Sequence, residues 1–163
     1  MNLNLKKKYI FIIALIVVID QISKLIIKIN FTIYSEVNII TGFFQIRYVK
    51  NSGAVWGLFS NTPHSFIPKV ITGLSLIALI IVVYYFVKIN PSCILELTSL
   101  SLITGGALGN NIDRLYQGYV VDFLDFYISK YHWPTFNVAD FCISSGVLLL
   151  IFSFWRGNCA SIK

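Results

Sequence analysis

Four long runs of apolar residues dominate the chain and predict four membrane-spanning helices. They cover about residues 9–27, 66–87, 95–115 and 135–155. Each run has about 19–22 residues, close to the length that a helix needs to cross the hydrocarbon core of a bilayer. The first and third runs are the least apolar. A spanning helix usually turns its polar residues towards neighbouring helices or a cavity, so these two runs are expected to carry polar side chains inside the bundle.

The connection between the first two runs, about residues 30–60, has a different pattern. Its residues 43–49 are rich in aromatic and β-branched side chains with partial alternation, which is typical of a strand. Gly42 precedes this segment, and residues 51–53 (Asn-Ser-Gly) follow it with turn chemistry. We therefore expect a single, mainly α-helical membrane domain over residues 1–163, with a small β-sheet on the outer face of the helices.

The composition supports a membrane protein. Of the 163 residues, 56% are hydrophobic and 12% are charged, whereas a soluble domain usually carries about 25% charged residues. The net charge is +6, but the basic residues do not form one long stripe, so no nucleic-acid partner is expected. No small-residue cleavage site follows the first run, and we expect it to be an uncleaved helix.

The basic residues also predict how the chain is oriented. With four spans, one side of the membrane carries Lys6, Lys7, Lys8, Lys88, Arg156 and Lys163. The positive-inside rule assigns that side to the cytoplasm, so both termini are expected to be cytoplasmic. The connections at about 28–65 and 116–134 then face outwards.

Neither cysteine nor histidine forms a recognisable metal site. The three cysteines are an odd number without ligand spacing, and we expect no disulfide framework. His64 and His132 are isolated and are expected to be loop or interfacial residues. We therefore expect no metal and no organic cofactor.

Polar residues in or beside the apolar runs gather at one depth. With a rise of about 1.5 Å per residue, all of them fall in the outer half of the membrane. They are Asp20, Lys24, Asn110, Asp113, Arg114, Asp122 and Asp140. Ionisable groups at membrane depth indicate a functional site. Asp122 and Asp140 are the two acids expected to face each other across a cleft.

Several of these residues are spaced to share a helix face, three or four positions apart. The pairs are Asp20 with Lys24, Asn110 with Arg114, and Asn137 with Asp140. The first pair either neutralises itself or contacts the substrate. Asp113 is expected to pair with Arg114 or a lysine rather than to act in catalysis. Asp125 and Glu36, on the outward segments, are expected to be solvated. In the small-residue stretch 105–109, Gly106 either packs against a helix or leaves room for a ligand.

Five segments resemble the signature blocks of bacterial lipoprotein signal peptidase (signal peptidase II), in that family's order and spacing. They are 20–24 (DQISK), 51–57 (NSGAVWG), 105–114 (GGALGNNIDR), 120–123 (VVDF) and 136–140 (FNVAD). The chain departs from the family pattern at Trp56 and Asn111, which lie away from the expected chemistry.

The resemblance implies an aspartic endopeptidase of the bacterial inner membrane, inhibited by globomycin, with its active site towards the outer face. We expect it to act as a monomer. Its partners would be membrane lipid and prolipoproteins whose cysteine carries diacylglycerol. It also implies four transmembrane helices with a small extracytoplasmic β-sheet cradle and an outer loop over the active site. The implied catalytic pair is Asp122 and Asp140. The residues implied to contact the substrate or the catalytic acids are Asn51, Asn110, Arg114 and Asn137, and those implied to support the site are Asp20, Lys24 and Gly106.

The competing hypothesis is a small proton-coupled transporter or channel with intramembrane carboxylates as a relay. Inverted repeats or discontinuous spans would favour it, and the sequence contains neither. As an enzyme, the chain would use two carboxylates that share one proton, and the sequence leaves open which of them is ionised at rest.

Overall fold

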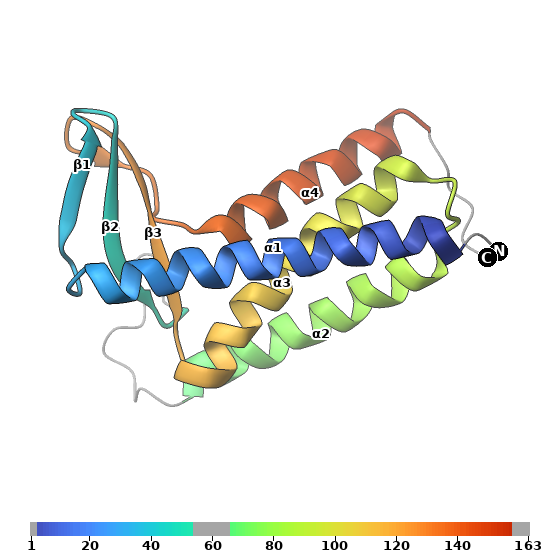
Figure 1. The fold of residues 1–163 in the computed structure, drawn as a ribbon, viewed down its shortest axis with the longest axis horizontal. Helices are drawn as coiled ribbons and strands as arrows, with labels where there is room; N and C mark the ends of the chain where they lie inside the picture. The colour runs from blue at the N-terminus through green and yellow to red at the C-terminus, as the bar shows by residue number, and fades with distance from the viewer. Residues whose placement is uncertain (1–2, 54–65, 158–163) are drawn as a thin grey trace.

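The computed structural model describes residues 3–53 and 66–157. The helices are α1 (Leu3–Asn30), α2 (Phe66–Lys88), α3 (Ile94–Gln117) and α4 (Val138–Trp155). The strands are β1 (Glu36–Ile40), β2 (Phe44–Asn51), β3 (Val120–Ile128) and β4 (Tyr131–His132). The four helices form an elongated bundle with the sheet at one end, and α1 begins and α4 ends at the other end (Figure 1). This architecture confirms the expected fold class.

Three of the four helices are long and apolar enough to cross a membrane: α1 over Lys6–Asn30, α2 over Pro68–Lys88 and α4 over Val138–Trp155. Helix α3 is less apolar and packs against all three of the others. It buries serine, threonine, asparagine and acidic side chains inside the bundle. The polar residues of the third apolar run therefore face protein rather than lipid, which removes the cost of exposing them to hydrocarbon.

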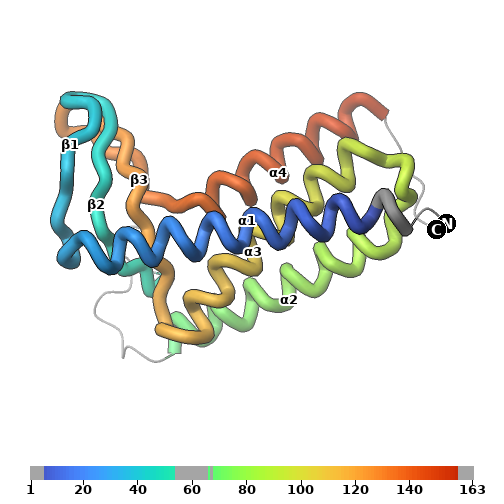
Figure 2. Tube along the Cα trace, in the orientation of Figure 1, coloured from blue at the N-terminus to red at the C-terminus, as the bar shows by residue number. Residues whose placement is uncertain are grey.

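The sheet is antiparallel, with the strand order β1-β2-β3-β4. Strand β3 lies within the connection between α3 and α4 and runs past the start of α4 (Figure 2). Because side chains alternate along a strand, Val121 and Phe123 point to one face of β3, where they form a core cluster with Ile27 and Tyr48. The opposite face of β3 carries Asp122 towards α4.

Three details differ from the expectations. Asp125, expected to be solvated, is fully buried. His132, expected to be isolated, contacts the Asp125 carboxylate through Nδ1 at 3.0 Å. Cys93 is disulfide-bonded, so the expectation of no disulfide is wrong. His64, Trp56 and residues 54–60 of the expected β-rich segment lie outside the described residues.

Candidate active site

Two carboxylates meet where β3 passes the first turn of α4. Asp122 comes from β3 and is 2% exposed. Asp140 occupies the third position of α4. The two residues come from different elements, and the amide of Asn137 joins them.

Asn137 is the N-cap of α4, and its local sequence explains its position. Its side-chain oxygen accepts a hydrogen bond from the Asp140 backbone N–H at 2.9 Å, and the Asp140 carboxylate accepts one from the Asn137 backbone N–H at 3.3 Å. This reciprocal capping box satisfies helix donors that would otherwise be unpaired. It also fixes the amide orientation, so Nδ2 donates to Asp122 Oδ1 at 2.7 Å. One residue therefore positions both carboxylates.

Asp122 receives a second donor from β2. Asn51 Nδ2 donates to Asp122 Oδ2 at 2.8 Å, and the Asn51 Oδ1 accepts from the Gly53 backbone N–H at 2.8 Å. Burial, followed by the negative charge of Asp140, raises the pKa of Asp122 to about 7, against the opposing effects of Asn51, Asn137 and Lys24. A carboxyl group with this pKa carries a proton for part of the time at neutral pH.

Asn110 connects Asp140 to the interior of the bundle. Its Nδ2 donates to Asp140 Oδ1 at 2.7 Å, while its Oδ1 accepts from Lys24 Nζ at 2.9 Å and from Asn137 Nδ2 at 3.2 Å. The two donors to Oδ1 leave only one orientation for this amide. The lysine thus fixes the amide group that faces Asp140.

Lys24 is itself enclosed by two carboxylates. Its Nζ lies 2.8 Å from Asp20 Oδ2 and 3.1 Å from Asp113 Oδ2, and all three side chains are at most 3% exposed. This geometry confirms the expected pairing of Asp20 with Lys24 and of Asp113 with a lysine. The carboxylates also accept backbone hydrogen bonds, Asp20 from the Ala139 N–H at 2.9 Å and Asp113 from the Val121 N–H at 3.3 Å. The cluster therefore ties α1 and α3 to the two segments that carry Asp122 and Asp140.

Glycines let the helices approach at this point. A Cβ at Gly106 would collide with the Ala139 carbonyl oxygen, and one at Gly109 would lie 2.5 Å from Asp20 Oδ2. Of the two alternatives for Gly106, the structure favours helix packing, because the space beside it is filled by α4. The short separation between α3 and α4 brings Asn110 within reach of Asp140.

Arg114 lies one turn beyond Asn110 and is half-buried. Its guanidinium is close enough to Asp140 and Asp122 to interact with both electrostatically. Within residues 3–53 and 66–157 it makes no hydrogen bond or ion pair. Its five donors are therefore available to an incoming group.

The sequence did not reveal all of the site. It missed the backbone contacts of Asp20 and Asp113, and it missed an aromatic cavity beside the sheet. One signal for the cavity was present, since the apolar residues Leu124 and Phe126 follow Asp122 at every second position of β3. In the described part of the chain, no three metal-ligating side chains are grouped to hold an ion.

Comparison with known proteins agrees with the resemblance to signal peptidase II. The family profile described as signal peptidase (SPase) II matches residues 12–156. A lipoprotein signal peptidase of Syntrophus aciditrophicus is 39% identical over 85% of this chain and 86% of its own. One from Francisella tularensis subsp. novicida is 40% identical over 93% of this chain and 94% of its own.

Two solved structures share the fold. Both are described as bacterial membrane enzymes solved by the in meso method. One, at 2.3 Å resolution, has a TM-score of 0.81 and 32% identity and covers 96% of this chain and 94% of its own. The other, at 1.9 Å, has a TM-score of 0.81 and 35% identity and covers 92% of this chain and 94% of its own.

Proposed function

Because the chain belongs to the signal peptidase II family of aspartic peptidases, we propose that it cleaves diacylglyceryl-modified prolipoproteins with Asp122 and Asp140 as its catalytic pair. It is a lipoprotein signal peptidase and a multi-pass membrane enzyme of bacteria. The observation that carries the assignment of the pair is the shared Asn137, which hydrogen-bonds to Asp122 and caps the helix turn that carries Asp140. Two carboxylates held together in this way can share one proton.

The geometry favours a division of labour between the two acids. Asp122 is the more buried, and with a pKa of about 7 it holds the shared proton for part of the time at neutral pH. Asp140 lies in the first turn of α4, where the helix dipole favours a negative charge. We therefore assign Asp122 as the acid that hydrogen-bonds to the scissile carbonyl and Asp140 as the base.

With Asp122 as the acid and Asp140 as the base, each proton transfer in the reaction has a donor and an acceptor. Asp140 takes a proton from a water molecule as the oxygen attacks the carbonyl carbon, while Asp122 donates its proton to the carbonyl oxygen. A tetrahedral intermediate forms without a covalent bond to the enzyme. As the peptide C–N bond breaks, Asp140 passes its proton to the leaving amine and the intermediate returns a proton to Asp122. The signal peptide is released as a carboxylic acid, which becomes a carboxylate by giving its proton to the new amine or to water.

Three further residues are assigned to positioning and substrate contact. Asn51 and Asn110 each donate to one catalytic carboxylate. Arg114, without a partner among the described residues, supplies donors for a backbone carbonyl of the substrate. Lys24 and Asp20 act through Asn110 and the start of α4, so they support the site without touching the substrate.

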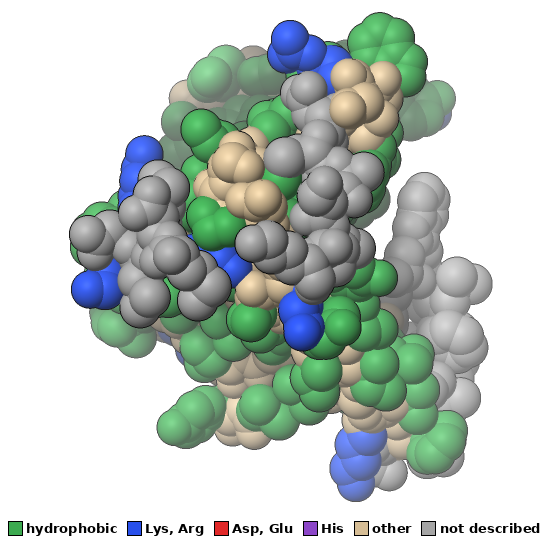
Figure 3. Space-filling view, turned by 90° about the vertical axis from the view of Figure 1, so that its right-hand side faces the viewer, with side chains coloured by type: hydrophobic (Ala, Val, Ile, Leu, Met, Phe, Trp, Pro, Cys, Tyr) green, Lys and Arg blue, Asp and Glu red, His purple; other side chains and the backbone are tan. Residues whose placement is uncertain are grey.

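The distribution of charge supports the proposed orientation. Figure 3 views the end of the bundle where α1 begins and α4 ends, and among the described residues visible there the charged side chains are the blue lysines and arginines. Lys6 and Lys88 lie at this end, and Lys6 Nζ donates to the Val87 carbonyl at 2.6 Å. By the positive-inside rule we place this end in the cytoplasm and Asp122 and Asp140 towards the outer leaflet. All of the proposed site residues come from one chain, and we expect a monomer.

The proposal is tested by incubating the purified protein in detergent with a diacylglyceryl-modified prolipoprotein and following the shortened product on a gel. Asp122→Asn and Asp140→Asn should each lower the cleavage rate by at least about 10³-fold, because each removes one half of the proton transfer. Glu36→Gln, a change at an exposed carboxylate of β1, is the matched control and should cleave at the wild-type rate. Full activity in either aspartate variant would refute the assignment of the pair.

The same preparations test the alternative relay. The Asp20–Lys24–Asp113 cluster is closed by its own ion pairs, and no observation favours proton transport through it. Proton flux into liposomes without cleavage of any prolipoprotein would overturn the peptidase assignment in favour of a transporter.

A further inference from the structure

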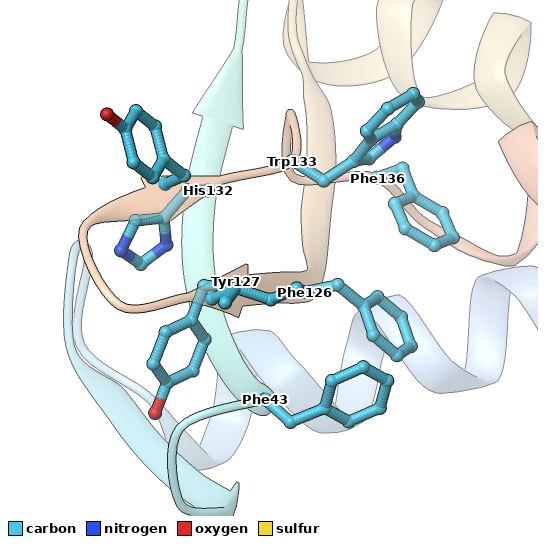
Figure 4. A pocket seen from close by; sticks show the side chains of 8 residues that line it. Phe43, Phe126, Tyr127, His132, Trp133 and Phe136 are labelled. Atoms are coloured by element: carbon cyan, nitrogen blue, oxygen red, sulfur yellow. The ribbon is translucent and has the colours of Figure 1, made fainter.

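A cavity of about 510 Å³ lies beside the β3–β4 hairpin and is lined mainly by aromatic side chains (Figure 4). The rings of Phe43, Phe126, Phe136 and Trp133 point to one side of the hairpin, whereas those of Tyr127 and His132 point to the other (Figure 4). The residues that line the cavity are Phe43, Phe126, Tyr127, Ile128, Tyr131, His132, Trp133 and Phe136, and we call this cavity the aromatic groove. Its volume falls in the range of about 300–1,000 Å³ that is typical of ligand pockets.

The groove is organised around the Phe126 ring. Its centroid lies 5.5 Å from that of Phe43 and 5.9 Å from that of Phe136. These rings are packed together, yet much of their surface remains uncovered, since Phe43 is 49% and Trp133 69% exposed. The uncovered ring surface can contact an apolar chain.

The groove is continuous with the candidate active site. Alternation along β3 places Asp122, Leu124 and Phe126 on one face of the strand. At about 3.3 Å per residue, Phe126 is about 13 Å along the strand from Asp122. Phe136 immediately precedes Asn137, and its backbone N–H donates to the Leu124 carbonyl at 3.1 Å. A group attached next to the scissile bond can therefore enter the groove.

We propose that the aromatic groove binds the first part of an acyl chain of the diacylglyceryl group on the substrate cysteine. This inference rests on the proposed function, in which that cysteine provides the leaving amine. The residue at the scissile bond carries a long apolar chain, and the aromatic groove is the apolar surface that leads away from Asp122.

The backbone around the groove favours a lipid over an extended peptide. A peptide that added a strand would need a free strand edge with unpaired backbone groups. In this region β3 pairs with β2 on one side and with β4 and Phe136 on the other. The groove therefore offers ring faces and few backbone donors, which suits a hydrocarbon chain.

The test compares two substrates that differ only in acyl length, one with diacetyl and one with dipalmitoyl glyceryl cysteine, so that only the second has a hydrocarbon chain to enter the groove. The double variant Phe43→Ala/Trp133→Ala removes two exposed rings of the groove. It should raise KM for the long-chain substrate by about tenfold, since the lost apolar contact corresponds to about 1.4 kcal/mol. The kcat for both substrates and the KM for the short-chain substrate should stay unchanged.

The matched control is Trp155→Ala, which removes an 81% exposed tryptophan from the far end of α4 and should leave both KM values unchanged. Thermal unfolding of each variant in detergent checks that the fold is intact. An equal loss with both substrates, or no loss with either, would overturn the acyl site while leaving the peptidase assignment in place. Failure of the wild-type enzyme to cleave either substrate would overturn the proposed function itself.

Discussion

Replacing Asp122 by asparagine should make the stability of the protein less dependent on pH. In the folded protein the pKa of Asp122 is raised from 3.8 to about 7, mainly by burial. Between these two values the folded state binds more protons at this residue than the unfolded state does. The wild-type protein should therefore lose stability as the pH rises through this window, whereas the asparagine side chain does not titrate.

The size of the effect follows from the same two values. At 1.36 kcal/mol for each pKa unit, a rise from 3.8 to about 7 corresponds to an upper limit of about 4 kcal/mol. The asparagine variant also loses some stability at every pH, for a reason that does not depend on protonation. Asn51 and Asn137 both donate to Asp122, and both amides are fixed by backbone hydrogen bonds to their oxygens. An amide at position 122 has a single acceptor oxygen, so one donor is left unpaired at about 1–3 kcal/mol.

We therefore expect Asp122→Asn to be less stable than the wild type at pH 4. The difference in stability between the two proteins should shrink steadily, in favour of the variant, as the pH rises to 7. The assay is thermal unfolding in detergent, followed by tryptophan fluorescence from pH 4 to pH 8, where 1 kcal/mol corresponds to about 2–4 °C. Glu36→Gln, at an exposed carboxylate, should differ from the wild type by the same amount at every pH. A difference between Asp122→Asn and the wild type that does not change with pH would refute the reasoning about burial.

Four further outcomes follow from the geometry. The kcat/KM for cleavage should fall as the pH rises through about 7, because Asp122 must hold a proton; a flat profile from pH 6 to 9 would contradict this. Lys24→Met should destabilise the protein by about 3–5 kcal/mol in thermal unfolding, because it leaves two buried carboxylates without their cation. Asn137→Ala should cost about 1–2 kcal/mol through the lost cap and lower kcat at least about 10²-fold, whereas equal kcat would exclude a positioning role. Gly106→Ala should cost about 1–3 kcal/mol in thermal unfolding by forcing α3 from α4, while Gly73→Ala, with open space around its Cβ, should cost nothing.

Much of the site was predictable because some of its contacts are local. Asp20 and Lys24 are four residues apart on α1 and form an ion pair at 2.8 Å, as helix periodicity predicts. Asn137 and Asp140 are three residues apart and form a capping box at the start of α4. Such contacts depend only on the periodicity of one helix, so they can be predicted from the spacing of residues along the sequence.

Other features depended on how separate elements pack. The sequence left open whether Asp113 would pair with Arg114 or a lysine, and the rotation of α3 against α1 decides in favour of Lys24. Asp125 was expected to be solvated, but Gln45 from β2 donates to it at 2.7 Å and the side chain is buried. Neither outcome can be read from spacing along one segment, since each depends on the side chains that a neighbouring element presents.

The amino-acid sequence by itself determined the four apolar helices, the strand segment and the two acids expected to form a pair. The length of an apolar run and the spacing within one helix are properties of consecutive residues, and they do not change when the elements assemble. Only the tertiary structure decided that one amide, Asn137, contacts both acids and that an aromatic groove begins beside Asp122. These features arise from the register between β3 and its neighbours and from the close approach of α3 to α4, which exist only once the chain has folded.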